Sequence, residues 1–347
     1  MPAFASLLIA WQRRHGRKGL PWQDTRDAYR IWLSEVMLQQ TQVAAVIPYY
    51  QRFVSRFPDV QALAAADEDE VLRLWSGLGY YARARNLHRA ARKVVSNYGG
   101  RFPDAVEEIE EIPGVGRSTA AAIATFAFGR RAAILDGNVK RVLARCYGVG
   151  GWPGSREVEA KLWRLAERLL PRDHLGVYTQ ALMDLGATVC IRKPRCEVCP
   201  ARRRCVARRE ERTHELPAPR PKRVVPLRNA TWLLLLHHRQ VLLERRPGAG
   251  LWGGLWSFPV ASNARYAAQA RELGCEISSP RELEPLEHGF THFRLRIRPV
   301  LCEVTRALPS AAAPGRLWID LEDAAQAAVP VPVKKLIARL GASTASW

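Results

Sequence analysis

Four cysteines near the middle of the chain are spaced so that their thiolates could bind one metal centre. Cys190, Cys196, Cys199 and Cys205 follow the pattern C-x5-C-x2-C-x5-C. Four thiolates within so short a segment can enclose a zinc ion or an iron–sulfur cluster. The other cysteines are scattered, as is typical of reduced thiols, and the first residues lack the order of a signal peptide. The spacing therefore predicts a metal site rather than a disulfide framework, with zinc and iron–sulfur both open.

Basic residues surround these cysteines. The stretch 192–223 holds twelve lysines and arginines against four acids, and the whole chain has a net charge of +20. Such a field attracts nucleic acid and makes binding strongly dependent on salt. A GC-rich genome can also raise arginine content, so the placement of the charge argues more than its total. We expect the cysteine loop to face a polyanion.

A glycine-rich turn separates two predicted helices before the cysteines. It reads Pro113-Gly114-Val115-Gly116 and is followed by Ser118 at the start of the second helix. Glycines allow a tight turn, and the N–H groups at a helix start bind phosphate. The pattern predicts a helix-hairpin-helix that grips a DNA backbone without reading its sequence. Taken alone, such a turn is also a common connector between helices.

The periodicity of apolar residues divides the chain into two regions, which differ in their predicted secondary structure. Up to about residue 215 it is helical, with Asp104 as an expected N-cap. The predicted helical windows are 60–75, 84–96, 104–112, 118–128, 155–169 and 174–190. No apolar run approaches the ~20 residues that cross a bilayer, so we expect no membrane insertion.

A proline-rich basic linker at 216–228 precedes the second region, whose pattern predicts β-strands. Segments 230–236 and 241–245 predict paired strands, and 293–297 predicts a half-buried strand with a basic outer face. A closing helix is expected over 333–340. The fold class is therefore a mainly α region followed by a smaller α/β domain.

The order of hairpin, aspartate and four cysteines resembles the endonuclease III superfamily of DNA glycosylases. Within it, four strings resemble the MutY family of adenine glycosylases: LPWQ at 20–23, SEVMLQQTQV at 34–43, GLGYYARARNLH at 77–88 and LDGNVKRVLARCYG at 135–148. The resemblance covers nearly the whole chain. It implies a six-helix barrel over about 28–135 within a glycosylase region 1–215, whose N-terminal helix joins 136–215 in a cluster domain. A Nudix-like domain is implied over 229–347.

Two carboxylates are the candidate catalytic groups. Glu35 lies in an apolar stretch, where desolvation would favour its protonated form and suit a general acid. The resemblance implies that Glu35 protonates adenine, that Asp136 stabilises the sugar cation, and that Asn138 orients water or Asp136. From the residues alone, Asp136 also fits a helix cap, and both roles are compatible.

Three further residues concern the handling of DNA. Chemistry on a base requires its extrusion from the duplex, and the resemblance implies that Gln40 and Tyr80 enter the helix near the lesion. Ordinary surface glutamine and core tyrosine are the alternatives. Relatives that cleave the abasic strand carry lysine where this chain has Ser118, and serine cannot form a Schiff base. We therefore expect a monofunctional glycosylase, with Gly114, Gly116 and Ser118 in contact with DNA.

The resemblance also implies one [4Fe–4S] cluster per chain, bound by the four cysteines. The usual family spacing is C-x6-C-x2-C-x5-C, so the first loop of this chain is one residue shorter. The C-terminal domain lacks the acidic box of active Nudix hydrolases, so we expect it not to hydrolyse pyrophosphates. Its Phe290-Thr291-His292 corresponds to the Phe-Ser-His loop that reads 8-oxoguanine in the family.

Together these features predict a base-excision-repair hydrolase that acts on N-glycosyl bonds. The expected partner is double-stranded DNA with adenine opposite 8-oxoguanine or guanine, bound by a monomer in the bacterial cytoplasm, at the nucleoid. One rival is an endonuclease III-like or thymine–guanine glycosylase. The other is a non-catalytic, metal-stabilised DNA-binding or sensor protein, in which Glu35 and Asp136 would be incidental.

Overall fold

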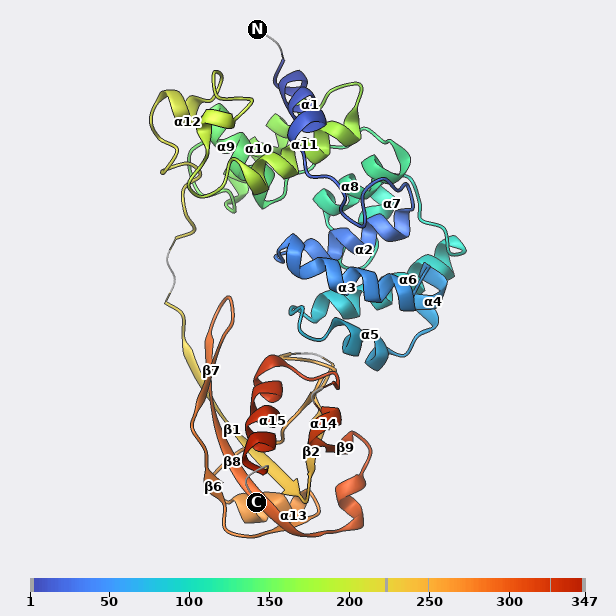
Figure 1. Ribbon diagram of the computed structural model, residues 1–347, viewed down its shortest axis with the longest axis vertical. Coiled ribbons are helices and arrows are strands. Elements are labelled where there is room, and N and C mark those ends of the chain that lie inside the picture. Colours follow the sequence, from blue (N-terminus) through green and yellow to red (C-terminus); the bar gives the residue numbers. More distant parts are fainter. Residues whose placement is uncertain (1–2, 222–223, 249, 325, 345–347) are drawn as a thin grey trace. The chain divides into compact units, whose positions relative to one another are not determined.

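The computed structural model describes residues 3–221, 224–248, 250–324 and 326–344, which form two compact units. The first unit comprises 1–65 and 86–222, and the second comprises 66–85 and 223–347. Figure 1 shows that helices build the first part of the chain and that a sheet dominates the last. Among the described residues, no helix is both long and apolar enough to cross a membrane.

Ten α-helices belong wholly to the first unit as described. They are α1 Phe4–His15, α2 Ala28–Leu38, α3 Val43–Arg56, α4 Val60–Ala65, α7 Val106–Glu110, α8 Arg117–Phe128, α9 Gly137–Tyr147, α10 Arg156–Leu169, α11 Leu175–Thr188 and α12 Val206–Arg209. A 3-10 turn, η1, spans Cys196–Val198. Helix α5 Glu68–Trp75 lies in the second unit, and α6 Ala82–Tyr98 contributes residues to both.

The start of α7 corrects one local prediction. The sequence suggests Asp104 as its N-cap, but the helix begins at Val106 behind Ala105, and no side chain caps it. The Asp104 carboxylate instead pairs with the guanidinium of Arg130. A partner 26 residues away has therefore taken the acceptor that a local cap would use.

Two aspartates do cap the helices that matter for the site. Asp27 precedes α2, and its carboxylate accepts hydrogen bonds from the N–H groups of Tyr29 and Arg30. Asp136 precedes α9 and accepts one from Val139 N–H at 2.8 Å. Side-chain acceptors at this position satisfy N–H groups that have no partner within the helix.

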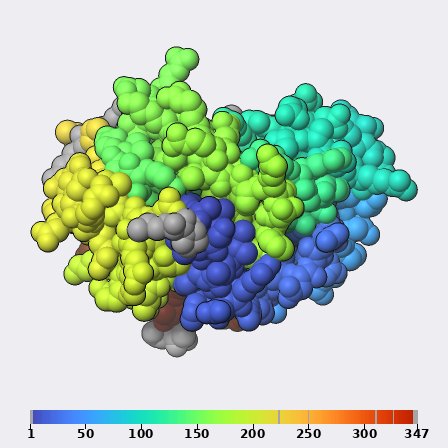
Figure 2. All heavy atoms as spheres, turned by 90° about the horizontal axis from the view of Figure 1, so that it is seen from above, coloured from blue at the N-terminus to red at the C-terminus, as the bar shows by residue number. Residues whose placement is uncertain are grey.

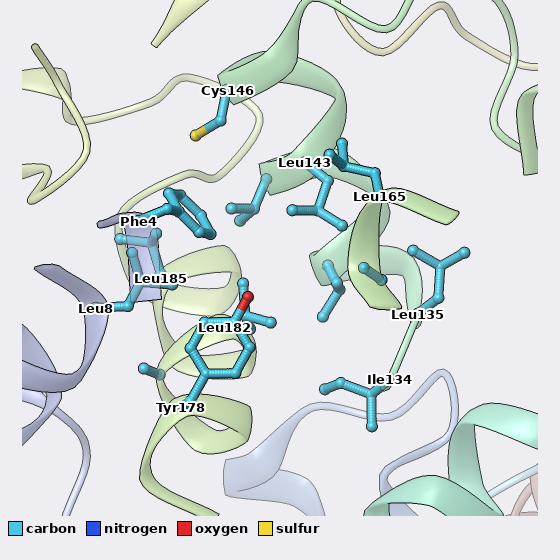
Figure 3. Packing of buried hydrophobic residues seen from close by; sticks show 14 of the residues in the cluster. Phe4, Leu8, Ile134, Leu135, Leu143, Cys146, Leu165, Tyr178, Leu182 and Leu185 are labelled. Atoms are coloured by element: carbon cyan, nitrogen blue, oxygen red, sulfur yellow. The ribbon is translucent and has the colours of Figure 1, made fainter. Parts of the chain in front are cut away.

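One hydrophobic core joins the N-terminal helix to the segment that carries the cysteines. Figure 3 shows Phe4 and Leu8 of α1 facing Tyr178, Leu182 and Leu185 of α11. Leu143 and Cys146 of α9 close the same core. Helix α1 lies at the surface between α11 and the cysteine-bearing segment (Figure 2). Residues far apart in sequence are therefore fixed around α9, whose N-cap is Asp136.

The second unit is built on a mixed sheet. Its strands are β1 Leu227–His237, β2 Gln240–Arg245, β3 Trp256–Ser257, β4 Val260–Ala261, β5 Cys275–Ile277, β6 Arg281–Glu282, β7 Leu286–Gly289, β8 Arg294–Ala307 and β9 Arg316–Asp320. The main path runs β3-β2-β1-β8-β5. Strands β1 and β2 form the expected antiparallel pair, while β1 and β8 run parallel.

Helices cover both faces of this sheet. Helix α15, Val331–Thr344, packs on one face against residues such as Trp232 and Ile297, and α13, Tyr266–Glu272, packs on the other against Leu233 and Cys302. Along β8, Leu295 and Ile297 are buried while Arg294, Arg296 and Arg298, which alternate with them, are exposed, as the sequence pattern predicts. The predicted fold class, a mainly α region followed by a smaller α/β domain, is confirmed.

Candidate active site and nucleic-acid interface

Glu35 lies on the wall of a cavity of about 470 Å³ in the first unit. Helix α2, which carries it, is apolar on almost every side, and Trp32, Leu33 and Met37 are fully buried. A helix that is apolar all round sits inside a fold. Glu35 is the carboxylate of this helix, and it is only partly exposed, towards the cavity.

The environment of Glu35 favours the protonated acid. Burial, and to a smaller extent the negative charge of Asp136, raise the pKa of Glu35 to about 8. Loss of hydration penalises the carboxylate more than the neutral acid, and a second negative charge adds to the penalty. At neutral pH the Glu35 carboxyl therefore carries a proton that it can donate.

Asp136 has a different environment. Desolvation raises its pKa above the ordinary value, and the N–H groups of Val139 and Asn138, the Asn138 side chain and the charge of Arg141 offset part of this rise. Hydrogen bonds to the anion stabilise the ionised form. Asp136 does not line the cavity with Glu35, yet the two carboxyl groups interact electrostatically. A reaction that needs both a proton donor and an anion can use two carboxyl groups whose environments differ in this way.

Arg141 links Asn138, which is close to Asp136 in sequence, to the cysteine segment. This role of Arg141 was not predicted from the sequence. Its guanidinium donates to Asn138 Oδ1 at 2.8 Å, to the Gly186 carbonyl at 2.7 Å and to the Cys190 carbonyl at 2.6 Å. The hydrogen bond from Arg141 thereby fixes the orientation of the Asn138 side chain. A motif search offers no signal for this role, because basic residues are common in helices.

A second network missed by sequence reasoning holds the cavity wall. The fully buried Asp184 carboxylate accepts hydrogen bonds from Gln12 Nε2 at 2.9 Å, Arg17 Nε at 2.7 Å and Gln180 Nε2 at 2.8 Å. Arg17, Gln12 and Gln180 also line the cavity that contains Glu35. A buried carboxylate with this many donors fixes their positions. The cavity therefore presents amide and guanidinium groups in set orientations.

The glycine-rich turn lies between α7 and α8 as expected. Gly114 has φ +80°, and a side chain there would meet Asn86 at 2.8 Å. Gly116 precedes α8, whose N-terminus has no side-chain cap. Ser118 lies in the first turn of α8, and its hydroxyl accepts a hydrogen bond from Leu135 N–H at 3.0 Å. Ser118 thus ties the hairpin to the residue that immediately precedes Asp136.

The four candidate cysteines line one cavity, together with Cys146 of α9. No described group of three or more His, Cys, Asp or Glu side chains is arranged to hold a single metal ion. Arg145 is buried beside these thiols and donates to Cys190 Sγ at 3.5 Å and to the Ile191 carbonyl at 2.6 Å. A buried cation calls for negative charge nearby.

Cys146 also belongs to this group of thiols, although its position in the sequence does not indicate it. Spacing groups it with the scattered cysteines, but its thiol interacts with that of Cys205 inside the cavity. Only the packing of α9 against the cysteine segment brings the two together. The cavity is therefore lined by five thiols, four from one segment and one from α9.

Gln40 and Tyr80 share an unusual backbone conformation. Both have positive φ, +56° and +50°, which non-glycine residues seldom adopt. Gln40 is exposed just after α2, and Tyr80 is 51% exposed in the loop before α6. Side chains held out of a fold by a strained backbone are common at functional sites.

Within the second unit, an open groove of about 750 Å³ brings Tyr80 together with Phe290, Thr291 and His292. With Phe293 these residues form the tight connection between β7 and β8, which is closed by Phe290 N–H donating to the Phe293 carbonyl at 2.8 Å. The Phe290 ring stacks on Phe293 with centroids 4.5 Å apart. The loop is therefore rigidly supported and borders the same groove as Tyr80.

Comparisons with known proteins identify the family of the chain. Residues 33–168 match the HhH-GPD superfamily of base excision DNA repair proteins, and residues 231–339 match the NUDIX domain. The chain is 36% identical over 341 residues to an adenine DNA glycosylase of Buchnera aphidicola, covering 96% of both chains. It is 35% identical to the human adenine DNA glycosylase, covering 96% of this chain and 73% of that one.

Among solved structures, a thermostable thymine-DNA glycosylase is similar with a TM-score of 0.55 and 32% identity, over 60% of this chain and 95% of that one. The fold and the site thus define a base excision DNA repair protein of the helix-hairpin-helix superfamily. Within it, the chain belongs to the adenine DNA glycosylase family.

Proposed function

We propose that this chain is a monofunctional adenine DNA glycosylase of base excision repair, which removes adenine mispaired with 8-oxoguanine or guanine. The observation that carries the proposal is a pair of carboxyls in unlike environments that interact electrostatically. Glu35, with a pKa of about 8, lies on the wall of a cavity, whereas Asp136 is raised in pKa by burial but accepts hydrogen bonds that oppose this shift and stabilise its anion. Family membership supports the choice of adenine.

The reaction divides between these two groups. Glu35 donates its proton to N7 of the extruded adenine as the C1′–N9 bond breaks and its electron pair leaves with the base. Asp136 stabilises the oxocarbenium ion that remains, as a carboxylate does in glycosidases. Water then adds at C1′ and returns a proton to Glu35. Asn138, held by Arg141, orients the water or Asp136.

The cavity wall suits a flipped base. Gln12, Arg17 and Gln180 offer amide and guanidinium groups whose positions are fixed by Asp184. Groups of this kind recognise a base through the hydrogen bonds along its edges. We infer that these side chains select adenine, while Gly114, Gly116 and Ser118 bring the hairpin against the DNA backbone and Gln40 and Tyr80 enter the stack.

The absence of lysine at position 118 supports hydrolysis without strand cleavage. A hydroxyl cannot form the Schiff base that a lyase needs. The Ser118 hydroxyl also has a structural task, since it accepts the Leu135 N–H. The product we expect is therefore an intact strand with an abasic site.

We further infer that Cys190, Cys196, Cys199 and Cys205 hold one [4Fe–4S] cluster. The thiolates of such a cluster each bind a different iron, so their sulfurs stand farther apart than the ligands of one zinc ion. In the described structure the four thiols line one cavity but do not converge on a position for a single metal ion, which is compatible with the wider spacing of a cluster. The buried Arg145 would balance the negative charge of the cluster. When bound, the cluster would supply a crosslink that fixes a basic, DNA-facing loop.

The metal content of the protein tests this inference. Protein purified without oxygen should be yellow-brown, with about four irons per chain and negligible zinc. Cys199→Ser should lose most of the iron, whereas Cys302→Ser, a buried thiol of the second unit, should keep it. One zinc per chain, or equal iron in the two variants, would refute the cluster.

The remaining roles are assigned to the C-terminal part. We propose that 216–228 is a linker and that the Nudix-like domain 229–347 reads 8-oxoguanine through Phe290, Thr291 and His292. Thr291 keeps the hydroxyl of the family's serine and adds a methyl group. The six-helix barrel over about 28–135, a monomeric state and action at the nucleoid in bacterial cytoplasm complete the proposal.

The test of the function is a base-release assay on a panel of duplexes. Adenine opposite 8-oxoguanine or guanine should be released, and the abasic strand should break only when alkali is added. Release of thymine opposite guanine would favour the related glycosylases. Binding to all duplexes with no base released would favour a DNA-binding or sensor protein.

A further inference from the structure

The loop that carries Tyr80 is hydrogen-bonded to the buried guanidinium of Arg83. Arg83 lies in the first turn of α6 and is only 9% exposed. Its guanidinium donates to the carbonyls of Gly79 at 3.2 Å and Leu78 at 3.4 Å. A guanidinium in so buried a place would be costly unless its contacts served the fold or the site.

Two aromatic rings enclose the same guanidinium. It lies 5.3 Å from the centroid of Trp75 and 5.4 Å from that of Tyr80. Trp75, fully buried in α5, also donates its indole N–H to the Gly79 carbonyl at 3.0 Å. Trp75 and Arg83 thus hold the loop at a shared carbonyl, and Arg83 extends that support to the Tyr80 ring.

The loop needs such support because its backbone is strained. Gly77, Gly79 and Tyr80 all have positive φ, and Tyr80 at +50° is in a region that non-glycine residues seldom adopt because it is strained. The Tyr80 ring remains 51% exposed with Arg83 beside it. Without a brace, the ring would be free to relax towards the loop.

We propose that Arg83 is a positioning residue that holds Tyr80 in place to enter the DNA stack. The inference rests on the proposed function, since it concerns the ring that is proposed to enter at the lesion. A side chain that separates stacked bases must offset the loss of stacking between them. A stiff, pre-placed ring achieves this, whereas a mobile ring loses binding energy to its own ordering. Lysine is a poor replacement for Arg83, because it lacks the planar guanidinium that contacts both aromatic rings.

A double-mutant cycle tests the proposal. The measured quantity is the dissociation constant for a duplex with a non-cleavable adenine analogue opposite 8-oxoguanine, in wild type, Arg83→Met, Tyr80→Ala and the double variant. Methionine keeps the length and removes the buried charge, so the fold should be retained. We expect Arg83→Met to weaken mispair binding by about tenfold, the size of one lost cation–π or charged hydrogen bond. In the Tyr80→Ala background its effect should fall below about twofold, because effects that act through one side chain are not additive.

The controls separate positioning from general damage. Arg89→Met, an exposed arginine on the same helix, should bind as wild type does. Fully paired DNA should be bound equally by wild type and Arg83→Met, because no stack is opened there. Arg83→Lys provides a second variant, expected to weaken mispair binding similarly, and thermal melting establishes that each protein is folded.

Additive effects of Arg83→Met and Tyr80→Ala in folded, mispair-binding protein would overturn the inference. So would equal weakening on paired and mispaired DNA. The proposed function fails differently: wild-type protein would then release no adenine, whatever the cycle shows. The binding cycle needs no base release, so the two failures are distinguishable.

Discussion

Replacing Glu35 with glutamine should lower the single-turnover rate of adenine release by about 10²–10⁴-fold, or more, while binding to the mispaired duplex stays near normal. Glutamine keeps the shape of the side chain on the cavity wall but has no proton to donate. The measurement is free adenine released at saturating protein. Glu157→Gln, an exposed residue of α10, is the matched control and should react as wild type does.

The same variant should be more stable than wild type, and the gain should depend on pH. The folded pKa of Glu35, about 8, lies above its ordinary value of 4.5. The folded state therefore binds this proton more tightly than the unfolded state does. The stability gained from the protonated Glu35 is complete below the unfolded pKa and is lost as pH rises through the folded pKa, because ionisation then leaves a buried charge. Glutamine does not titrate, so the rise in melting temperature should be larger at about pH 9 than at about pH 5. A wild-type rate of release in Glu35→Gln would refute the assigned acid.

Asp136→Asn should lower the rate of adenine release by about 10²–10³-fold without unfolding the protein. Asparagine still offers an acceptor to Val139 N–H and is as good an N-cap as aspartate, so α9 should begin where it does now. What it lacks is the negative charge that stabilises the sugar cation. Single-turnover rate and melting temperature, measured together, separate the two roles.

A second helix cap provides the control for this substitution. Asp27→Asn makes the same chemical change before α2, at a residue that does not line the cavity. It should keep nearly full activity. If Asp136→Asn were as active as Asp27→Asn, Asp136 would be only a helix cap.

The parts of the site that sequence reasoning predicted are those encoded locally. The burial of Trp32, Leu33 and Met37 around Glu35 follows from one short apolar stretch, and the same stretch predicts a raised pKa. The capping role of Asp136 was also expected from its place before a helix. The β1–β2 pair and the alternation along β8 follow from residue patterns of period two.

What sequence reasoning could not supply are contacts between distant segments. Asp184 joins α1, the segment after it and α11, and nothing within any one of these marks the set. Cys146 approaches Cys205 only because α9 packs on the cysteine segment, and Asp104 loses its expected cap to Arg130. Likewise, the composition change at 216–228 gives no hint that 66–85 form one compact unit with 223–347.

The pH dependence of adenine release tests the central claim most directly. The single-turnover rate of wild-type protein on a duplex with adenine opposite 8-oxoguanine should be nearly constant up to about pH 8. Above that it should fall about tenfold per pH unit, as Glu35 loses the proton that it must donate. Because Asp136 interacts with Glu35, the midpoint belongs to the pair. A rate that stays constant or rises above about pH 8, with the protein folded and the duplex saturated, would contradict the assignment of Glu35 as the general acid.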